Sequence, residues 1–158
     1  MNSDRIYIYS GPKHSGKSSR LERWIATHEN VAGILSPDLE GKRYLKNIAS
    51  GELILMEAEG DEESVAVGKY VFSAAAFKKG NAWLREAFIH HHGWLVVDEA
   101  GPLELRGEGF ATVLREIMEA ENEELQLILV VREGLVEAVR DYFNITKFRN
   151  FDPENNII

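Results

Sequence analysis

Residues 11–18 read Gly-Pro-Lys-His-Ser-Gly-Lys-Ser, which matches the phosphate-binding pattern G-x-x-x-x-G-K-[ST]. An apolar, strand-like run at residues 6–9 leads into the pattern, and a run with helical spacing at residues 19–28 follows it. In a strand–loop–helix arrangement of this kind, backbone N–H groups and the N-terminus of the helix converge on an anion. The sequence therefore predicts that the chain binds a nucleoside triphosphate or a closely similar ligand.

Every position of this loop is a candidate for phosphate binding. Lys17 is also a candidate catalytic residue, because it would reach the β- and γ-phosphates, and the Ser18 hydroxyl would bind Mg²⁺. The alternative is an ordinary glycine turn with an exposed lysine, and the strand-like and helix-like flanks argue against it. The candidate phosphate-binding residues are Gly11, Pro12, Lys13, His14, Ser15, Gly16, Lys17, Ser18 and Ser19.

A second motif lies at residues 94–99, where the apolar run Trp-Leu-Val-Val ends in Asp-Glu. Open α/β sheets bind ligands at the carboxyl ends of their strands, so Asp98 is placed to hold Mg²⁺, directly or through water. Glu99 would face the γ-phosphate and activate the attacking water. The alternatives are a cap or turn former for Asp98 and a solvated loop acid for Glu99. With both acids in these roles, the predicted phosphate binder becomes a predicted hydrolase.

Phosphoryl transfer also needs positive charge at the transition state, which an arginine can supply. Arg132 follows the apolar run 125–131 and would emerge on the same rim as Asp98. It is the candidate catalytic arginine, and the alternative is a strand-end arginine paired with Glu133. Glu104, just beyond the second motif, is either an outer partner of the metal or a surface acid.

Other notable residues are expected to be structural. Three consecutive histidines at residues 90–92 point in different directions at a helix end, so they cannot all bind one metal ion without distortion. Trp24, Trp83 and Trp94 lie within periodic apolar patterns and are expected in the core.

Composition limits the partners. The chain has 158 residues, and we expect one domain spanning residues 1–158. It carries 18 basic and 26 acidic residues, a net charge of −8 that makes nucleic acid an improbable main ligand. The absence of cysteine excludes disulfides and thiolate metal sites. We expect a cytoplasmic protein without a membrane partner, since no apolar run approaches the ~20 residues that span a bilayer and no signal-peptide pattern is present.

Hydrophobic periodicity predicts strands alternating with helices. Strands are expected at residues 5–10, 31–36, 94–98 and 125–131, with a short last strand near 147–151. Helices are expected at residues 19–28, 78–90, 110–121 and 135–143. Residues 43–57 favour two strands around a turn, and residues 65–72 a further short strand with a bend at Gly68. The order predicts a mainly parallel α/β domain with a small antiparallel hairpin insertion at residues 37–72, which could contact a protein partner.

With both motifs in place, the chain resembles the nucleoside-triphosphatase family typified by thermophile enzymes and the human cancer-related nucleoside-triphosphatase. The resemblance covers roughly residues 5–135 and depends most on Val-Val-Asp-Glu-Ala-Gly-Pro-Leu-Glu-Leu at residues 96–105. It implies a three-layer, RecA-like P-loop NTPase fold in which the 125–131 strand lies between the phosphate-loop strand and the Asp98 strand. One departure is Ala100, which stands where a larger aliphatic residue is common.

The resemblance also implies an activity and roles for individual residues. The implied activity is slow, Mg²⁺-dependent hydrolysis of ATP, GTP and other triphosphates with little discrimination between bases. Lys17 and Ser18 would bind phosphate and metal, Asp98 would support Mg²⁺, and Glu99 would be the water-activating base.

Two other functions share the phosphate loop. A small-molecule or nucleotide kinase usually closes an arginine-rich lid over its substrates, and the central insertion holds no cluster of arginines. A nucleotide-dependent binding switch would use the 37–72 insertion as its partner surface. Acceptor-dependent loss of ATP would indicate the kinase, and hydrolysis that rises sharply with a partner protein would indicate the switch.

Overall fold

The computed structural model describes residues 5–12, 15–60, 62–67, 70–90, 93–122 and 124–154. Several predictions concern residues outside these ranges, namely the phosphate-loop roles of Lys13 and His14, the bend at Gly68 and the orientation of His91 and His92.

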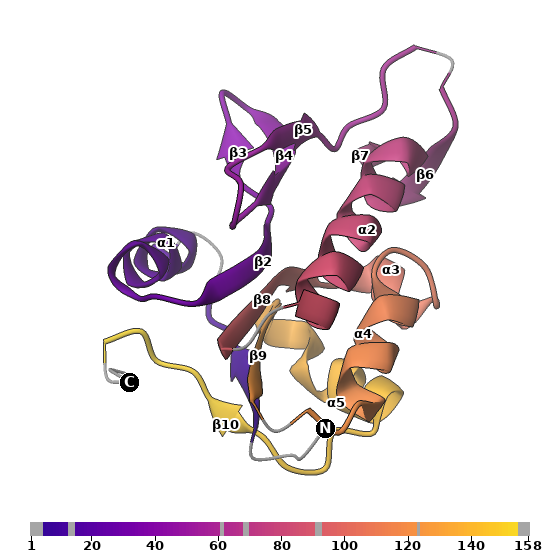
Figure 1. Cartoon of the computed structure of the whole chain (residues 1–158). Coiled ribbons are helices and arrows are strands. Elements are labelled where there is room, and N and C mark those ends of the chain that lie inside the picture. Colours follow the sequence, from indigo (N-terminus) through magenta and orange to yellow (C-terminus); the bar gives the residue numbers. More distant parts are fainter. Residues whose placement is uncertain are drawn as a thin grey trace.

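Strands and helices alternate along most of the chain (Figure 1). The strands are β1 (Ile6–Tyr9), β2 (Val31–Leu35), β3 (Asp38–Leu39), β4 (Lys42–Asn47), β5 (Leu53–Leu55), β6 (Ser64–Val67), β7 (Tyr70–Ser73), β8 (Gly93–Ala100), β9 (Leu125–Val131) and β10 (Arg149–Asn150). The helices are α1 (Lys17–Thr27), α2 (Ala74–His90), α3 (Pro102–Leu105), α4 (Ala111–Glu119) and α5 (Val136–Phe143), with a 3₁₀ turn η2 (Glu133–Leu135) before α5. In the described part of the chain, none of the helices is long and apolar enough to cross a membrane.

The central sheet has the strand order β10-β1-β9-β8-β2-β4-β3, with β5 paired to β4. The pairs from β10 through β2 are all parallel, and β4 runs antiparallel to β2. Strand β9 lies between the phosphate-loop strand β1 and the Asp98 strand β8, as the family resemblance implies. The predicted α/β class with a mainly parallel sheet is confirmed.

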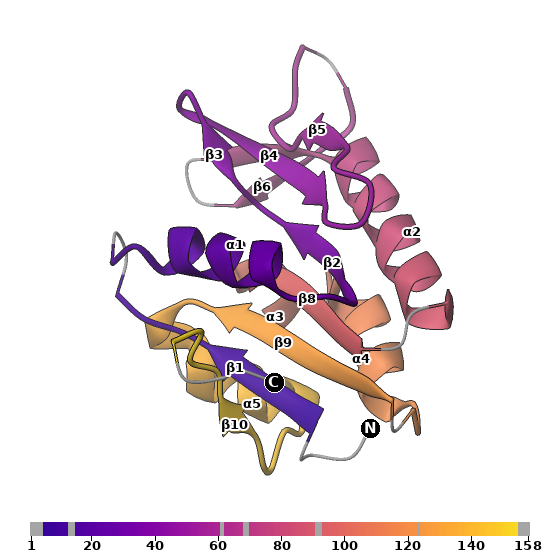
Figure 2. The same ribbon diagram turned by 60° about the vertical axis from the view of Figure 1, so that its left-hand side comes forward.

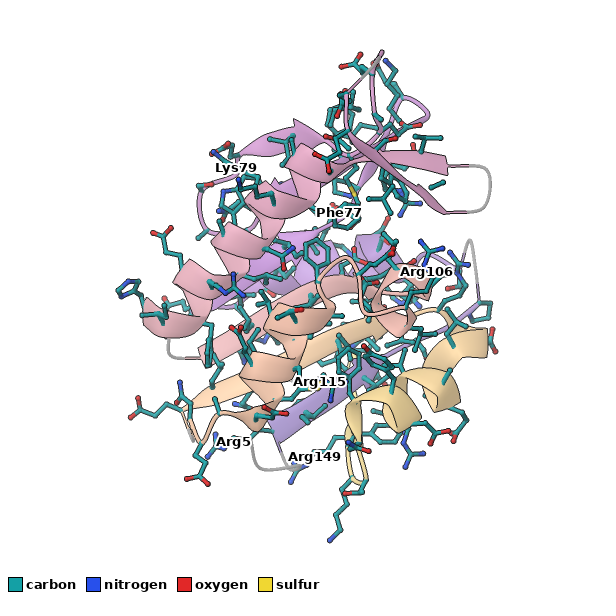
Figure 3. All side chains as sticks on the ribbon, turned by 90° about the vertical axis from the view of Figure 1, so that its right-hand side faces the viewer. Arg5, Phe77, Lys79, Arg106, Arg115 and Arg149 are labelled. Atoms are coloured by element: carbon teal, nitrogen blue, oxygen red, sulfur yellow. The ribbon has the colours of Figure 1, made fainter. Side chains whose placement is uncertain are left out.

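Helices cover both faces of this sheet, which gives three layers (Figures 1 and 2). Strand β8 shows why both faces need a covering layer, because its apolar side chains alternate between the two faces of the sheet. Trp94 and Val96 pack against α1, whereas Leu95 and Val97 pack with residues of α2, α4 and α5. On the latter side Phe77 is buried 5.1 Å from the Phe110 ring, measured between centroids (Figure 3).

The face beneath α1 is rich in aromatic residues. Trp24 is buried and packs edge-on against both Trp94, at 5.2 Å, and Phe151, at 5.0 Å between ring centroids. Tyr7 and Tyr9 complete this aromatic cluster from β1. The prediction that Trp24 and Trp94 belong to the core is confirmed, and Trp83 packs against the core on the opposite face.

Residues between β2 and α2 form the antiparallel part of the fold. The single strand predicted at residues 65–72 is wrong, because this segment is the β6–β7 hairpin, in which Val65 pairs with Phe72. Its apolar residues are interrupted only by Gly68 and Lys69, and so short an interruption fits either one bent strand or two strands joined by a tight turn. Helix α2 begins at Ala74 rather than at residue 78, since the Ser73 hydroxyl accepts the N–H of Ala76 at 3.2 Å and caps the helix.

The β6–β7 hairpin also contacts the segment after the second motif. Arg106, which follows α3, donates from Nη2 to the carbonyl oxygen of Ala66 at 3.1 Å (Figure 3). Helix α3 itself begins with Pro102. Proline suits the first helical position because its fixed φ fits the helix and its missing N–H needs no partner there.

Candidate active site at the carboxyl edge of the sheet

The two sequence motifs meet at the carboxyl edge of the parallel strands. Val130 of β9 pairs with Tyr9 of β1 on one side and with Asp98 of β8 on the other. The phosphate loop leaves β1 directly after Tyr9, so it starts level with Asp98, and only β9 lies between the two strands that carry them (Figure 2). Arg132 follows β9 at the same edge.

The described part of the phosphate loop has groups that fit an anion. Gly16 adopts φ +81°, a left-handed conformation that favours glycine, and α1 starts at the next residue. The first turn of α1 has neither a side-chain cap nor an acidic residue. The Ser15 Oγ is buried and has no hydrogen-bond partner within the described part of the chain. A phosphate oxygen is the kind of acceptor to which these N–H and O–H groups can donate.

Two residues that the sequence analysis did not single out hold this loop in place. The Tyr9 hydroxyl donates to the carbonyl oxygen of Lys17 at 3.0 Å. The Arg20 guanidinium donates from Nη1 to the carbonyl oxygen of Ser15 at 2.9 Å. Arg20 lies one helical turn beyond the loop, and no motif assigns either residue a role. Burial raises the pKa of the Tyr9 phenol, so it remains a proton donor at neutral pH.

Asp98 lies level with the start of the loop in the sheet register, and its side chain is buried. The residue is 8% exposed, and the Ser36 N–H donates to its Oδ2 at 3.2 Å. The Ser36 hydroxyl also donates to the Asp98 carbonyl oxygen. Burial, together with the charge of Glu99, raises the pKa of the Asp98 carboxyl to about 6, although Lys17 and Arg43 act in the opposite direction. A cation bound at this carboxylate would offset the cost of burying its charge.

Glu99 and Arg132 form an ion pair across the end of the sheet. Their Oε1 and Nη2 atoms lie 3.6 Å apart, with the Glu99 side chain 27% exposed and the Arg132 side chain 61% exposed. The Asp98–Glu99 peptide bond is cis, and the pairing of β8 with β9 shifts register between Asp98 and Ala100. The pairing with Glu133 considered as the alternative for Arg132 is not among the ion pairs of the described residues.

A family model described as NTPase matches residues 5–155. The chain belongs to this NTPase family. The resemblance inferred from the two motifs is therefore confirmed.

Two solved structures have the same fold as this family member. THEP1 from the hyperthermophile Aquifex aeolicus is similar with a TM-score of 0.72 and 17% identity, over 96% of this chain and 92% of that one. A human cancer-related nucleoside triphosphatase is similar with a TM-score of 0.69 and 19% identity, over 94% of this chain and 88% of that one. No curated protein sequence gives a significant match.

Glu104 in this NTPase-family chain is a buried structural acid, 3% exposed. Its Oε1 accepts the N–H of Gly101 at 2.8 Å, and its Oε2 accepts the N–H of Phe110 at 2.9 Å. Burial raises the pKa of this carboxyl, and the two N–H groups oppose the rise. The surface position considered for Glu104 is wrong, because the loop from α3 to α4 folds around its carboxylate.

Glu104→Gln is expected to destabilise the chain by about 1–3 kcal/mol, because the glutamine amide nitrogen cannot accept a hydrogen bond and leaves one buried N–H unpaired. Urea unfolding measures the change. Glu119→Gln removes the same charge from an exposed position on α4 and should change stability by no more than about 0.5 kcal/mol. Equal stability of the two variants would contradict the structural role of Glu104.

The described residues contain no group of three or more His, Asp or Glu side chains that could hold a metal ion. A magnesium–nucleotide site does not need one, because Mg²⁺ in such sites takes one or two carboxylates, phosphate oxygens and water.

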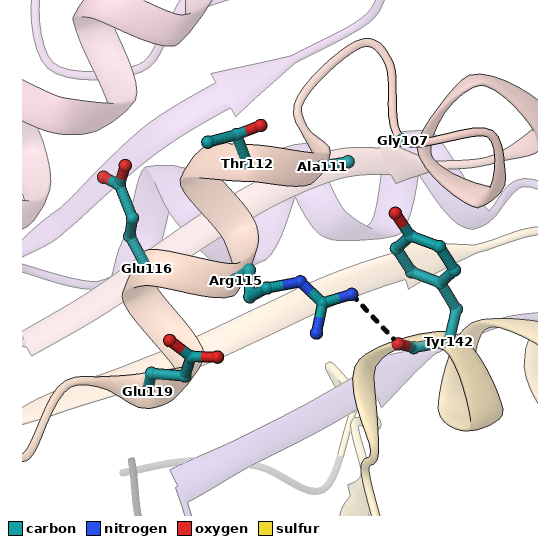
Figure 4. A pocket seen from close by; sticks show the side chains of 7 residues that line it. All are labelled: Gly107, Ala111, Thr112, Arg115, Glu116, Glu119 and Tyr142. Atoms are coloured by element: carbon teal, nitrogen blue, oxygen red, sulfur yellow. Dashed lines mark hydrogen bonds between the residues drawn. The ribbon is translucent and has the colours of Figure 1, made fainter.

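Two hollows lie on the face of α2, α4 and α5, away from this edge. One, of about 180 Å³, lies between α4 and α5, where Arg115 donates to the carbonyl oxygen of Tyr142 (Figure 4). The other, of about 620 Å³, is an open groove between α2 and α4. None of the residues predicted for phosphate, metal or catalysis lines either hollow.

Proposed function

We propose that the chain hydrolyses nucleoside triphosphates to diphosphate and phosphate, in a Mg²⁺-dependent reaction with little preference between bases. The observation that carries the proposal is the pairing of Val130 with both Tyr9 and Asp98, which brings the phosphate loop and the acidic motif to one edge. Membership of the NTPase family supports the same reaction class.

Phosphate binding is assigned to the loop. Its backbone N–H groups and the N-terminus of α1 would hold the α- and β-phosphates, and the Lys17 ammonium would reach the β- and γ-phosphates. Ser18 and Asp98 would hold Mg²⁺, which neutralises charge on the phosphate oxygens when bound. Recognition through backbone N–H groups reads phosphates rather than bases, which is why we propose low base specificity. The proposed phosphate-binding set is Gly11, Pro12, Lys13, His14, Ser15, Gly16, Lys17, Ser18 and Ser19.

Glu99 is assigned the activation of water. Its carboxylate would accept a proton from the water that attacks the γ-phosphorus, while the bond from that phosphorus to the β–γ bridging oxygen breaks and the diphosphate leaves. Arg132, whose Nη2 lies 3.6 Å from Oε1 of Glu99, would turn toward the phosphoryl oxygens as their charge develops.

Phosphate release from ATP, GTP, CTP and UTP, with Mg²⁺ or with EDTA, tests this function. We expect the four rates to agree within about tenfold and EDTA to abolish them. Lys17→Ala should lower phosphate release ~10²-fold or more, because it removes the main cation at the phosphates. Lys78→Ala, an exposed lysine on α2, is the matched control. Consumption of ATP only when an acceptor is added would contradict hydrolysis and favour a kinase.

A further inference from the structure

Arg43 lies in the antiparallel insertion but close to the proposed site. Strand β4 pairs with β2 through Leu35 and Lys46, and the ladder continues past the end of β2. There the Tyr44 N–H donates to the Pro37 carbonyl oxygen at 2.8 Å, and Arg43 pairs with Asp38. The chain that leaves β2 also holds Asp98 through its Ser36. Strand β4 therefore carries Arg43 beyond the carboxyl edge of the sheet, next to the segment bonded to Asp98.

The backbone of Arg43 is fixed on the side away from this segment. Its N–H donates to Oε2 of Glu57 at 3.0 Å, and its carbonyl oxygen accepts the N–H of Met56 at 2.9 Å. The residue is half-buried, and no carboxylate of the described residues lies within ion-pair distance of its guanidinium. The guanidinium thus brings an uncompensated positive charge to a place where water is partly excluded.

The charge of Arg43 acts on the same carboxylate as the phosphate-loop lysine. Both Arg43 and Lys17 lower the pKa of Asp98 against the effect of burial. In the sheet order β9-β8-β2-β4, Arg132 emerges on one side of Asp98 and Arg43 on the other. Arg132 already contacts Glu99, so of these two arginines Arg43 can bind an anion without first breaking an ion pair.

We propose that Arg43 binds the terminal phosphate of a nucleoside triphosphate at this site, and that it makes the site prefer triphosphates to diphosphates. This proposal rests on the proposed function. The phosphate loop cradles the α- and β-phosphates, so the group nearest Asp98 and beyond the loop is the γ-phosphate. A guanidinium presents paired N–H donors that match two phosphate oxygens, and it keeps its charge when partly buried.

Calorimetry tests the proposal by measuring the affinity of the chain for Mg-ADP and for the non-hydrolysable triphosphate Mg-AMP-PNP. Arg43→Ala is expected to weaken Mg-AMP-PNP binding by about 10- to 100-fold and Mg-ADP binding by less than about threefold. Lys42→Ala, which removes the same charge from the exposed neighbour on β4, should change neither by more than about threefold. Urea unfolding of each variant checks that it is folded.

Arg43→Lys keeps the charge but loses the paired donors, so it should weaken Mg-AMP-PNP several-fold and leave Mg-ADP unchanged. It also tests the proposal if Arg43→Ala does not fold. Equal weakening of both ligands, or a result equal to Lys42→Ala, would overturn the role of Arg43 while leaving the proposed function intact. Failure of the unsubstituted chain to bind either nucleotide would overturn both.

Discussion

Glu99→Gln is expected to lower phosphate release from Mg-ATP and Mg-GTP by ~10²-fold or more without weakening the binding of either nucleotide. Glutamine has nearly the shape of glutamate but cannot accept the proton of the attacking water. The ion pair with Arg132 is lost as well, and its contribution to stability is small because the arginine side chain is 61% exposed. The substitution therefore separates catalysis from binding.

The measurement combines steady-state phosphate release with calorimetric affinity for the non-hydrolysable analogues of both nucleotides, Mg-AMP-PNP and Mg-GMP-PNP. Glu133→Gln is the matched control, since it removes an exposed carboxylate next to Arg132 and should leave the rate within about twofold. A rate for Glu99→Gln close to that of the unsubstituted chain would exclude Glu99 as the general base. A loss of rate that follows a loss of affinity would instead assign Glu99 to nucleotide binding.

Gly33→Ala is expected to destabilise the chain by about 4 kcal/mol or more, which corresponds to a fall in Tm of roughly 8–16 °C. Gly33 lies inside β2 with φ +120°, and a Cβ there would meet the Val96 carbonyl oxygen at 2.0 Å and its nitrogen at 2.7 Å. Val96 belongs to the buried strand β8, which is held on both sides by parallel pairing. Neither backbone can move aside without breaking the sheet.

Gly41→Ala is the matched control for this position. Gly41 also has a positive φ, +80°, but a Cβ there would meet nothing within 4 Å. The substitution should lower the free energy of unfolding by the backbone strain alone, about 1–2 kcal/mol. Urea unfolding at one pH gives both values, and a difference below about 1 kcal/mol would show that the contact with Val96 is not what requires glycine. Because the same close approach brings Ser36 to Asp98, any Gly33→Ala protein that folds should also bind Mg²⁺–nucleotide more weakly.

The parallel part of the fold could be predicted because its residues carry unambiguous local signals. The strand at residues 125–131 is apolar and buried except at Gln126, which is half-buried, and the structure has it with the predicted bounds. Acids and glycines at the ends of neighbouring strands indicate the functional edge, since the carboxyl ends of parallel strands coincide. The register that places Tyr9 and Asp98 on either side of Val130 is a tertiary property, and no single segment encodes it.

The residues that support the site could not be predicted for the same reason. Ser36 follows β2 and bonds to Asp98 far away in the sequence, and a serine just after a strand is ordinarily a turn residue. Arg43 has no motif, and only the antiparallel pairing of β4 brings it to the edge. The buried position of Glu104 depends on N–H groups of Gly101 and Phe110, which its own sequence neighbourhood does not identify. The protein partner expected at residues 37–72 and the cytoplasmic location remain predictions.

The position of β1 in the sheet has a consequence for how the protein folds during its synthesis. Within the described part of the chain this strand pairs only with β9 and β10, which follow it far along the sequence. During translation the phosphate loop leaves the ribosome well before β9, and its strand lacks this hydrogen-bonded neighbour until β9 has also emerged. We therefore expect a nascent chain that carries the complete loop motif to bind a nucleotide only after β9 has paired with β1, so that nucleotide binding reports a completed parallel sheet.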